Sequence, residues 1–186
     1  MSQGSFLYGN TAVYRTEALR GVGGFARELG AFTDGYAMQA VALARGCCFI
    51  PERLAVWRRL DSGLARRTVK DVEASLRILD AATARMRREH PHLFPRRYVR
   101  RFEARFRFSV ARSAVSGDGQ PLEKIYRAMG APTRVDRTVC RLILWVTAGR
   151  GKALVPYLFG RLRPFDFWMV LRRETLGQLA LQGNRI

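Results

Sequence analysis

The sequence predicts an α+β protein that is predominantly helical, with a partial sheet region in residues 1–66 followed by a basic helical tail in residues 67–186. Three observations lead to this prediction. Short β-prone runs separated by glycine and proline occur in the first third of the chain. Apolar residues recur at helical spacing from about residue 68 onward. Apolar residues make up 48% of the 186 positions, which is enough to form a buried core.

Turn residues divide the first segment into short elements. We expect strands at residues 6–8, 12–14, 49–50 and 54–57. Thr16 should cap a short helix that stops at Gly21, and Gly23-Gly24 should form a tight bend. A second helix is expected from about Tyr36 to Arg45, with Asp34 before its start and Gly46 at its end.

Helical periodicity defines the tail. Thr68 followed by Asp71 resembles a capping box, and it opens a helix that His90-Pro91 ends. The apolar face of this helix consists of Val69, Val72, Leu76, Leu79, Thr83 and Met86. Further helices are expected at residues 97–113, 122–129, 135–147 and 166–181. Because His90 and His92 have no further ligand nearby in the sequence, we interpret them as part of a helix-ending loop and predict no metal site.

Arginine gives the chain its most pronounced bulk property. The formal net charge is +18, and all but three of the 33 basic residues are arginine. The excess is uneven, because residues 1–60 carry a net charge of +3 and residues 61–186 carry +15. A segment with this balance should attract phosphate groups on lipids, nucleic acids or a nucleotide-sugar. A general bias toward arginine in the coding sequence is an equally good explanation.

Cysteine usage and hydropathy indicate the setting of the protein. Cys47 and Cys48 are adjacent and Cys140 stands alone, a pattern that indicates neither a disulfide framework nor a zinc site. A reducing, cytoplasmic location fits best, and the first residues do not resemble a signal peptide. The best candidate for a membrane span, Leu142 to Ala148, is too short. We therefore expect a cytoplasmic protein that at most lies on the inner face of the cell membrane.

An ordered series of short motifs extends from Gly9 to Ala65. It begins with Gly-Asn-Thr-Ala-Val-Tyr-Arg-Thr-Glu-Ala-Leu-Arg (9–20) and Val-Gly-Gly-Phe (22–25), and continues through Asp34, Ile-Pro-Glu (50–52) and Val-Trp-Arg (56–58). This order resembles the acceptor-side, C-terminal half of family-2 nucleotide-sugar glycosyltransferases of the GT-A type. The resemblance implies a partial GT-A-like sheet in residues 1–66. It also implies transfer of a sugar from a nucleotide-sugar donor to a glycan, lipid-linked or protein acceptor.

Within this resemblance, Asp34 matches the second member of an acidic pair and would be the catalytic base. Inverting transfer needs a carboxylate within hydrogen-bond reach of the acceptor hydroxyl, to take its proton as the oxygen attacks the anomeric carbon. The N-terminus of a helix would also favour the charged carboxylate. The structural alternative is that Asp34 is only the N-cap of its helix.

The resemblance also implies substrate-binding roles for five other residues. Gly23 and Gly24 would let the backbone approach a sugar closely, or they only form a tight turn. Phe25 would be a stacking platform or a core anchor. Trp57 is favoured as a core residue over a ligand platform. Arg58 would face the donor diphosphate, with a solvated strand end as the alternative.

Three departures from the family pattern bear on activity. Thr33, which would lie in the acceptor site, stands where the family has its first carboxylate, and Leu60 stands where it often has a histidine. The family's Asp-x-Asp motif, which holds a divalent cation (Mg or Mn) on the donor diphosphate, occurs nowhere in this sequence. We therefore expect the chain to be inactive alone, and to need a donor-binding half in a longer product or on a separate partner.

The segment Arg96 to Arg112 interleaves seven arginines with Tyr98, Phe102, Phe106 and Phe108. Three interpretations are open. The aromatic side chains pack on the rest of the tail, the helix lies on an anionic membrane surface, or it binds single-stranded nucleic acid. Nucleic acid is the least favoured, because no known nucleic-acid-binding signature is present. The alternative function is therefore that of a non-catalytic, basic helical protein that docks on a membrane or on nucleic acid.

Overall fold

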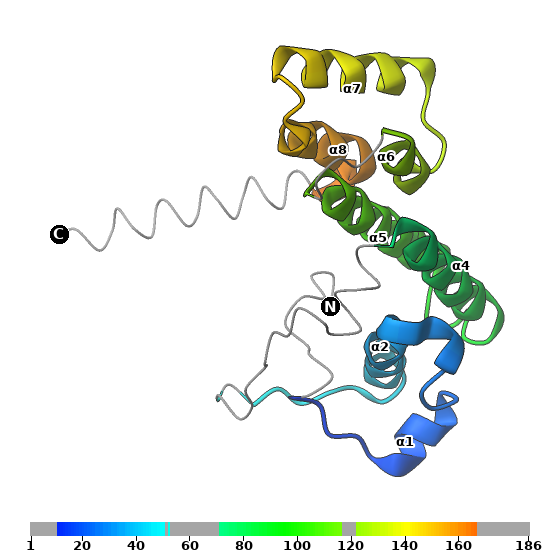
Figure 1. The fold of residues 1–186 in the computed structure, drawn as a ribbon. Helices are drawn as coiled ribbons and strands as arrows, with labels where there is room; N and C mark the ends of the chain where they lie inside the picture. Colours follow the sequence, from blue (N-terminus) through cyan, green and yellow to red (C-terminus); the bar gives the residue numbers. More distant parts are fainter. Residues whose placement is uncertain (1–10, 51, 53–70, 117–121, 167–186) are drawn as a thin grey trace. The chain divides into compact units, whose positions relative to one another are not determined.

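The computed structural model of the protein describes residues 11–50, 52, 71–116 and 122–166, and these residues form helices joined by turns (Figure 1). The chain divides into two compact units, Met1–Arg100 and Arg101–Ile186. The prediction of a predominantly helical protein is confirmed. The predicted domain boundary between residues 66 and 67 lies outside the described residues and stays a prediction.

The predicted partial sheet is wrong for the part of the chain that the structure describes, which contains no strand. Residues 12–14 and 49–50 lie in no regular element, and the segments 6–8 and 54–57 fall outside the described residues. β-Propensity describes how a side chain fits a pleated, half-buried surface. A strand also needs a neighbour to pair with its backbone N–H and C=O groups, and the described residues supply no such neighbour.

In the described part of the first unit, a short 3₁₀ segment packs against two helices. The elements of this unit are α1 (Thr16–Gly21), η2 (Arg27–Phe32), α2 (Thr33–Arg45), α4 (Val72–Arg88) and the beginning of α5 (Arg96–Ser116). The segment η2 contacts both α2 and α4, and α1 contacts α2. The largest fully buried side chains of this unit are Leu29, Tyr36, Leu79, Met86 and Phe94. The rings of Tyr36 and Phe94 stack with their centroids 5.8 Å apart.

The ends of these helices largely follow the sequence signals. Gly46, with a φ of 80°, ends α2 as predicted, because glycine adopts the left-handed conformation without strain. The start of α4 is capped by Asp71, whose carboxylate accepts a hydrogen bond from the backbone N–H of Ala74 at 3.0 Å. Thr68 lies outside the described residues. The prediction that Thr16 caps α1 is wrong, because Thr16 is the first residue of the helix. The N-cap is Arg15, whose side chain makes no capping hydrogen bond.

All regular elements in the described part of the second unit are helices. Beyond the remainder of α5 it contains α6 (Leu122–Met129), α7 (Arg134–Val146), η3 (Gly151–Leu154), α8 (Val155–Leu162) and η4 (Pro164–Asp166). The predictions of helices at 122–129 and 135–147 are confirmed, whereas α8 was not predicted. The predicted helix at 166–181 lies outside the described residues except for Asp166. Figure 1 shows α7 lying over α6 and α8, and no helix in the described ranges is long and apolar enough to cross a bilayer.

Candidate functional site

The predicted bend at Gly23-Gly24 is confirmed, with φ angles of 81° and 67°. The backbone N–H of Gly24 donates a hydrogen bond to the Leu19 carbonyl at 2.9 Å, and that of Gly23 to the Arg20 carbonyl at 3.0 Å, so the bend closes the end of α1. A Cβ atom on Gly23 would lie 2.5 Å from Nη2 of Arg85. A side chain at position 23 would be strained by the positive φ, and it would displace the Arg85 guanidinium.

Arg85 contacts three other residues on this side of the first unit. Its guanidinium lies 2.6 Å from a Glu28 carboxylate oxygen and 2.8 Å from one of Glu89. The same group lies over the Tyr36 ring, 5.4 Å from its centroid. Burial raises the pKa of Tyr36, and the charge of Arg85 partly offsets this. Because Glu28 is 57 positions away in the chain, no local sequence pattern predicts this pairing.

Asp34 lies in the first turn of α2, and its side chain is exposed. The N-cap of α2 is Phe32, so the alternative interpretation of Asp34 as the N-cap is wrong. The carboxylate instead accepts a hydrogen bond from the backbone N–H of its neighbour Gly35 at 2.7 Å. The first turn of a helix stabilises a negative charge, because its backbone N–H groups are unpaired and point toward it. Asp34 is thus a solvent-accessible carboxylate in the first turn of a helix.

Tyr14 interacts with the Phe25 ring and with the charge of Asp34. The Tyr14 and Phe25 rings meet edge to face with their centroids 6.0 Å apart, and Phe25 is 52% exposed. Burial, and after it the negative charge of Asp34, raise the pKa of Tyr14. The sequence pattern predicts a strand at Tyr14 and therefore gives no indication of this contact. Tyr14 thus contacts Phe25 and lies within the electrostatic influence of Asp34, which follows Thr33 in the chain, whereas Gly23 faces Arg85.

Two hydroxyl groups at this site lack hydrogen-bond partners. Tyr14 Oη and Thr33 Oγ1 are buried atoms for which no partner exists in the described part of the protein. A buried hydroxyl without a partner destabilises a fold by about 1–3 kcal/mol. Such groups are therefore uncommon unless a ligand, a solvent molecule or another chain segment completes them. Together with Asp34 they give the site one carboxylate and two hydroxyls.

The structure gives less information about the other predicted site residues and about a metal site. Trp57 and Arg58 lie outside the described residues, so their roles stay predictions. Within the described ranges no group of three or more His, Cys, Asp or Glu side chains could hold a metal ion. The divalent cation that the family resemblance implies stays a prediction. His90 places its Nε2 atom 3.4 Å from the Val22 carbonyl oxygen, which links the loop after α4 to the glycine bend.

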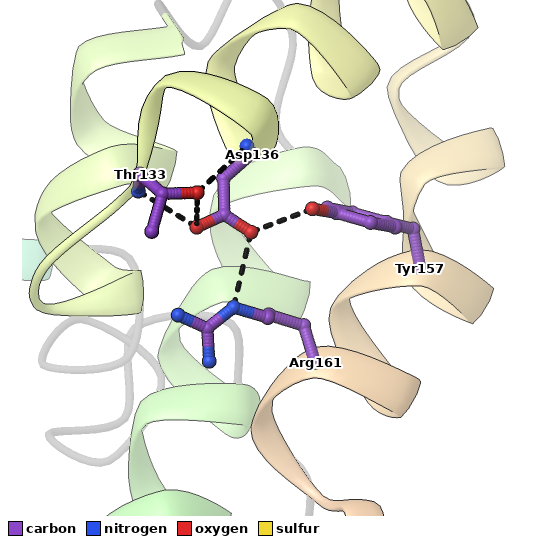
Figure 2. A network of polar contacts seen from close by, with 4 residues as sticks. All are labelled: Thr133, Asp136, Tyr157 and Arg161. Carbon is purple, nitrogen blue, oxygen red and sulfur yellow. Dashed lines mark hydrogen bonds and ion pairs between the residues drawn. The ribbon is translucent and has the colours of Figure 1, made fainter.

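A second polar cluster lies in the second unit around Asp136, which is only 2% exposed (Figure 2). One carboxylate oxygen accepts hydrogen bonds from the Tyr157 hydroxyl at 2.6 Å and from Nε of Arg161 at 3.0 Å. The other accepts from the backbone N–H and the hydroxyl of Thr133, at 2.7 and 2.8 Å. The Thr133 hydroxyl in turn accepts from the Asp136 N–H at 3.1 Å, which completes a capping box at the start of α7.

The Asp136 cluster joins helices rather than offering a reactive group. Burial alone would raise the pKa of Asp136, but the hydrogen bonds from Tyr157, Thr133 and Arg161 outweigh it and hold the pKa well below its usual range. Burial and the hydrogen bond to this carboxylate raise the pKa of Tyr157 to about 12. Both oxygens of Asp136 are fully engaged, so the cluster fixes α8 to the N-terminus of α7.

These pKa shifts predict how the stability of the second unit varies with pH. The lowered pKa of Asp136 stabilises the fold above the unfolded value of about 4, and this contribution is lost as the pH falls through the folded value. The raised pKa of Tyr157 stabilises the fold below a pH of about 10, and that contribution is lost as the pH rises toward 12.

We expect Tyr157→Phe to lower the free energy of unfolding at pH 7 by about 1–2 kcal/mol and to reduce the loss of stability at alkaline pH. Hydrogen exchange of α7 and α8 peptides across this pH range measures both. Equal alkaline slopes for the variant and the wild type would contradict the Tyr157–Asp136 hydrogen bond.

Comparison with known proteins identifies no relative of this chain. No protein-family model matches it, and no curated protein or solved structure shows significant similarity to it.

Proposed function

We propose that this chain is the acceptor-side part of an inverting nucleotide-sugar glycosyltransferase similar to family 2, with Asp34 as its general base. One observation carries the proposal. The exposed Asp34 carboxylate lies in the first turn of α2, close enough to the Tyr14–Phe25 aromatic pair for its charge to raise the pKa of Tyr14. This combination of a carboxylate and an exposed aromatic ring suits a sugar acceptor, because carbohydrates offer hydroxyl groups and apolar C–H faces.

The proposed reaction assigns a distinct task to each group. The Asp34 carboxylate takes the proton of an acceptor hydroxyl while that oxygen forms a bond to the anomeric carbon of the donor sugar. The bond from that carbon to the diphosphate breaks at the same time, and a nucleoside diphosphate leaves. The exposed ring of Phe25 would stack on the acceptor sugar. The unpartnered hydroxyls of Tyr14 and Thr33 are buried, so they would form hydrogen bonds with the acceptor and orient the attacking oxygen only after binding moves the atoms that cover them.

Exposed apolar residues in the first unit support the proposal that a donor-binding half completes this site. Val13 is fully exposed, and Phe49 and Ile50 are 71% and 57% exposed. All three lie in segments whose composition predicts strands, yet no described residue pairs with them. A partner sheet would bury these side chains and satisfy their backbone groups. That half would also hold the divalent cation, as the family resemblance implies.

The proposed cellular location follows from cysteine chemistry and from the acceptors of such enzymes. Cys47 and Cys48 are free and exposed, and Cys140 is free and buried, which agrees with a reducing, cytoplasmic compartment. A lipid-linked acceptor would bring the protein to the inner face of the cell membrane.

The function is tested with the native product of this gene, isolated from its own cells together with its bound partners. An immunoblot against the second unit first measures its mass. A band well above 21.1 kDa indicates a longer enzyme, and a band at that mass directs the search to a separate donor-binding protein. The isolated product is then incubated with radiolabelled nucleotide-sugars and a cell extract as acceptor. Transfer of label supports the proposal. If no donor is consumed by either the long product or the complex, the glycosyltransferase proposal is wrong.

A further inference from the structure

Helix α7 carries an apolar stripe on its outer face. Val135, Leu142, Trp145 and Val146 are 68%, 55%, 81% and 68% exposed. Their spacings of seven, three and one residues place them on one side of a helix with 3.6 residues per turn. The opposite side contains the buried residues Asp136 and Cys140, which attach the helix to its unit. The outer apolar stripe of α7 is thus distinct from the face that packs in the core.

Arginines border this stripe along one side. Arg134, Arg137 and Arg141 are exposed and follow one another at spacings of three and four residues, so they form a second line parallel to the apolar one. The Arg137 guanidinium lies over the Tyr126 ring of α6, 5.3 Å from its centroid. Beyond the end of the helix, Arg150 and Lys152 are also exposed. The described acidic residue of α7, Asp136, is buried in its own network, so the outer face of the helix is positively charged.

We propose that α7 docks this protein on an anionic membrane surface, lying in the plane of the lipid headgroups. An interfacial helix has apolar residues with a tryptophan on one face and arginine or lysine beside them. The apolar stripe would enter the boundary between headgroups and acyl chains, and the arginines would contact lipid phosphates. Tryptophan suits this depth, because its ring is apolar and its N–H group can still form a hydrogen bond.

Charge complementarity favours this occupant over two others. A second copy of the chain would bring the same three arginines against each other across a two-fold axis, which would be repulsive. Nucleic acid would satisfy the arginines but offers no apolar phase for Val135, Leu142 and Val146. Stacking of bases would involve only Trp145 among the four stripe residues. An anionic lipid surface is the partner that satisfies both the apolar stripe and the arginine line.

The inference places membrane binding on a different helix from the one that the sequence singled out. In α5, Arg105 pairs with Asp166 and Arg107 pairs with Glu103, and Phe108 is only 6% exposed. These contacts agree with the interpretation in which this helix packs its aromatic residues on the rest of the tail. Docking through α7 does not depend on the glycosyltransferase proposal, because no residue of the Asp34 site takes part in it.

The test is sedimentation of the full chain with vesicles of phosphatidylcholine alone or mixed with phosphatidylserine, at low and high salt. We expect binding only to the mixed vesicles, weakened by salt. The double variant Leu142→Ser/Trp145→Ser should weaken binding at least about tenfold, because it removes two apolar side chains from the interface. The double variant Arg134→Gln/Arg141→Gln should weaken it by about tenfold, at low salt.

Matched controls change exposed residues of the same type in the first unit. Phe49→Ser/Ile50→Ser and Arg20→Gln/Arg27→Gln should bind mixed vesicles as the wild type does. All four variants alter exposed side chains, so circular dichroism should show unchanged helix content. Absence of wild-type binding to mixed vesicles overturns the proposal, as does equal binding by the Leu142/Trp145 variant and its control. Two further outcomes also overturn it. One is a dimer of the wild-type chain in the absence of vesicles that the Leu142→Ser/Trp145→Ser variant dissociates. The other is binding of an oligonucleotide that only the Arg134→Gln/Arg141→Gln variant loses.

Discussion

Asp166→Asn should destabilise the second unit by about 3–5 kcal/mol. Asp166 is 1% exposed, and it accepts two hydrogen bonds from Arg105, at 2.9 and 2.7 Å, and a third from Nε of Arg163 at 2.7 Å. The hydrogen bonds from Arg105, together with those from Arg163, hold the pKa of Asp166 below its usual value. The neutral amide leaves two largely buried guanidinium groups without their counter-charge, which is more damaging than the loss of the ion pair itself.

This loss should extend to the aromatic cluster that Arg163 covers. Its guanidinium lies over the rings of Phe108 and Phe159, at 5.5 and 5.1 Å from their centroids, and these two rings meet edge to face. Hydrogen exchange of peptides from α5 and α8, combined with urea unfolding of the whole chain, measures the effect. Glu123→Gln is the matched control, because Glu123 is 63% exposed and its ion pair with Arg127 is long, at 3.9 Å. This control should change stability by less than about 0.5 kcal/mol. A similarly small effect of Asp166→Asn would contradict the buried ion-pair network.

Local patterns were sufficient to predict most of the helices. The bounds of α6 coincide with the predicted residues 122–129 and those of α7 lie within one residue of the prediction. Both segments combine helical apolar spacing with glycine, proline or threonine at their ends. Helix α8 was missed, although Pro156 in its first turn is a known signal for a helix start. Its apolar residues continue directly from η3, so no polar loop marks its beginning.

The errors and omissions share a physical cause, which is that they depend on partners far away in the sequence. Residues 12–14 and 49–50 have the composition of strands, but a strand exists only where another pairs with it. Arg105 and Asp166 are 61 positions apart, and a sequence with so many arginines gives no indication of which one a buried carboxylate selects. At the candidate site, the bend at Gly23 and Gly24 could be predicted because it depends on local backbone conformation. The start of α2 was predicted incorrectly, because the helix begins at Thr33, three residues before the expected start at Tyr36. The contact of Tyr14 with Phe25 could not be predicted.

Asp34→Asn should lower kcat by about 10²- to 10⁴-fold in the native preparation that shows transferase activity. The amide has nearly the same shape as the carboxylate but cannot take a proton from the acceptor hydroxyl. Because Asp34 is exposed and is not the N-cap of α2, the substitution should leave the fold and the KM for the donor unchanged. Steady-state kinetics with a radiolabelled nucleotide-sugar, together with thermal unfolding, separates loss of chemistry from loss of structure.

Three other carboxylates of the first unit already have structural roles. Glu28 and Glu89 are paired with Arg85, and Asp71 accepts the capping hydrogen bond of α4. Glu17→Gln provides the matched control, because Glu17 is also an exposed acidic residue in the first turn of a helix, α1. We expect this variant to retain full activity. If Asp34→Asn also retained it, Asp34 would have no part in the mechanism, and the hydroxyl of Tyr14 would be the next group to examine, by Tyr14→Phe.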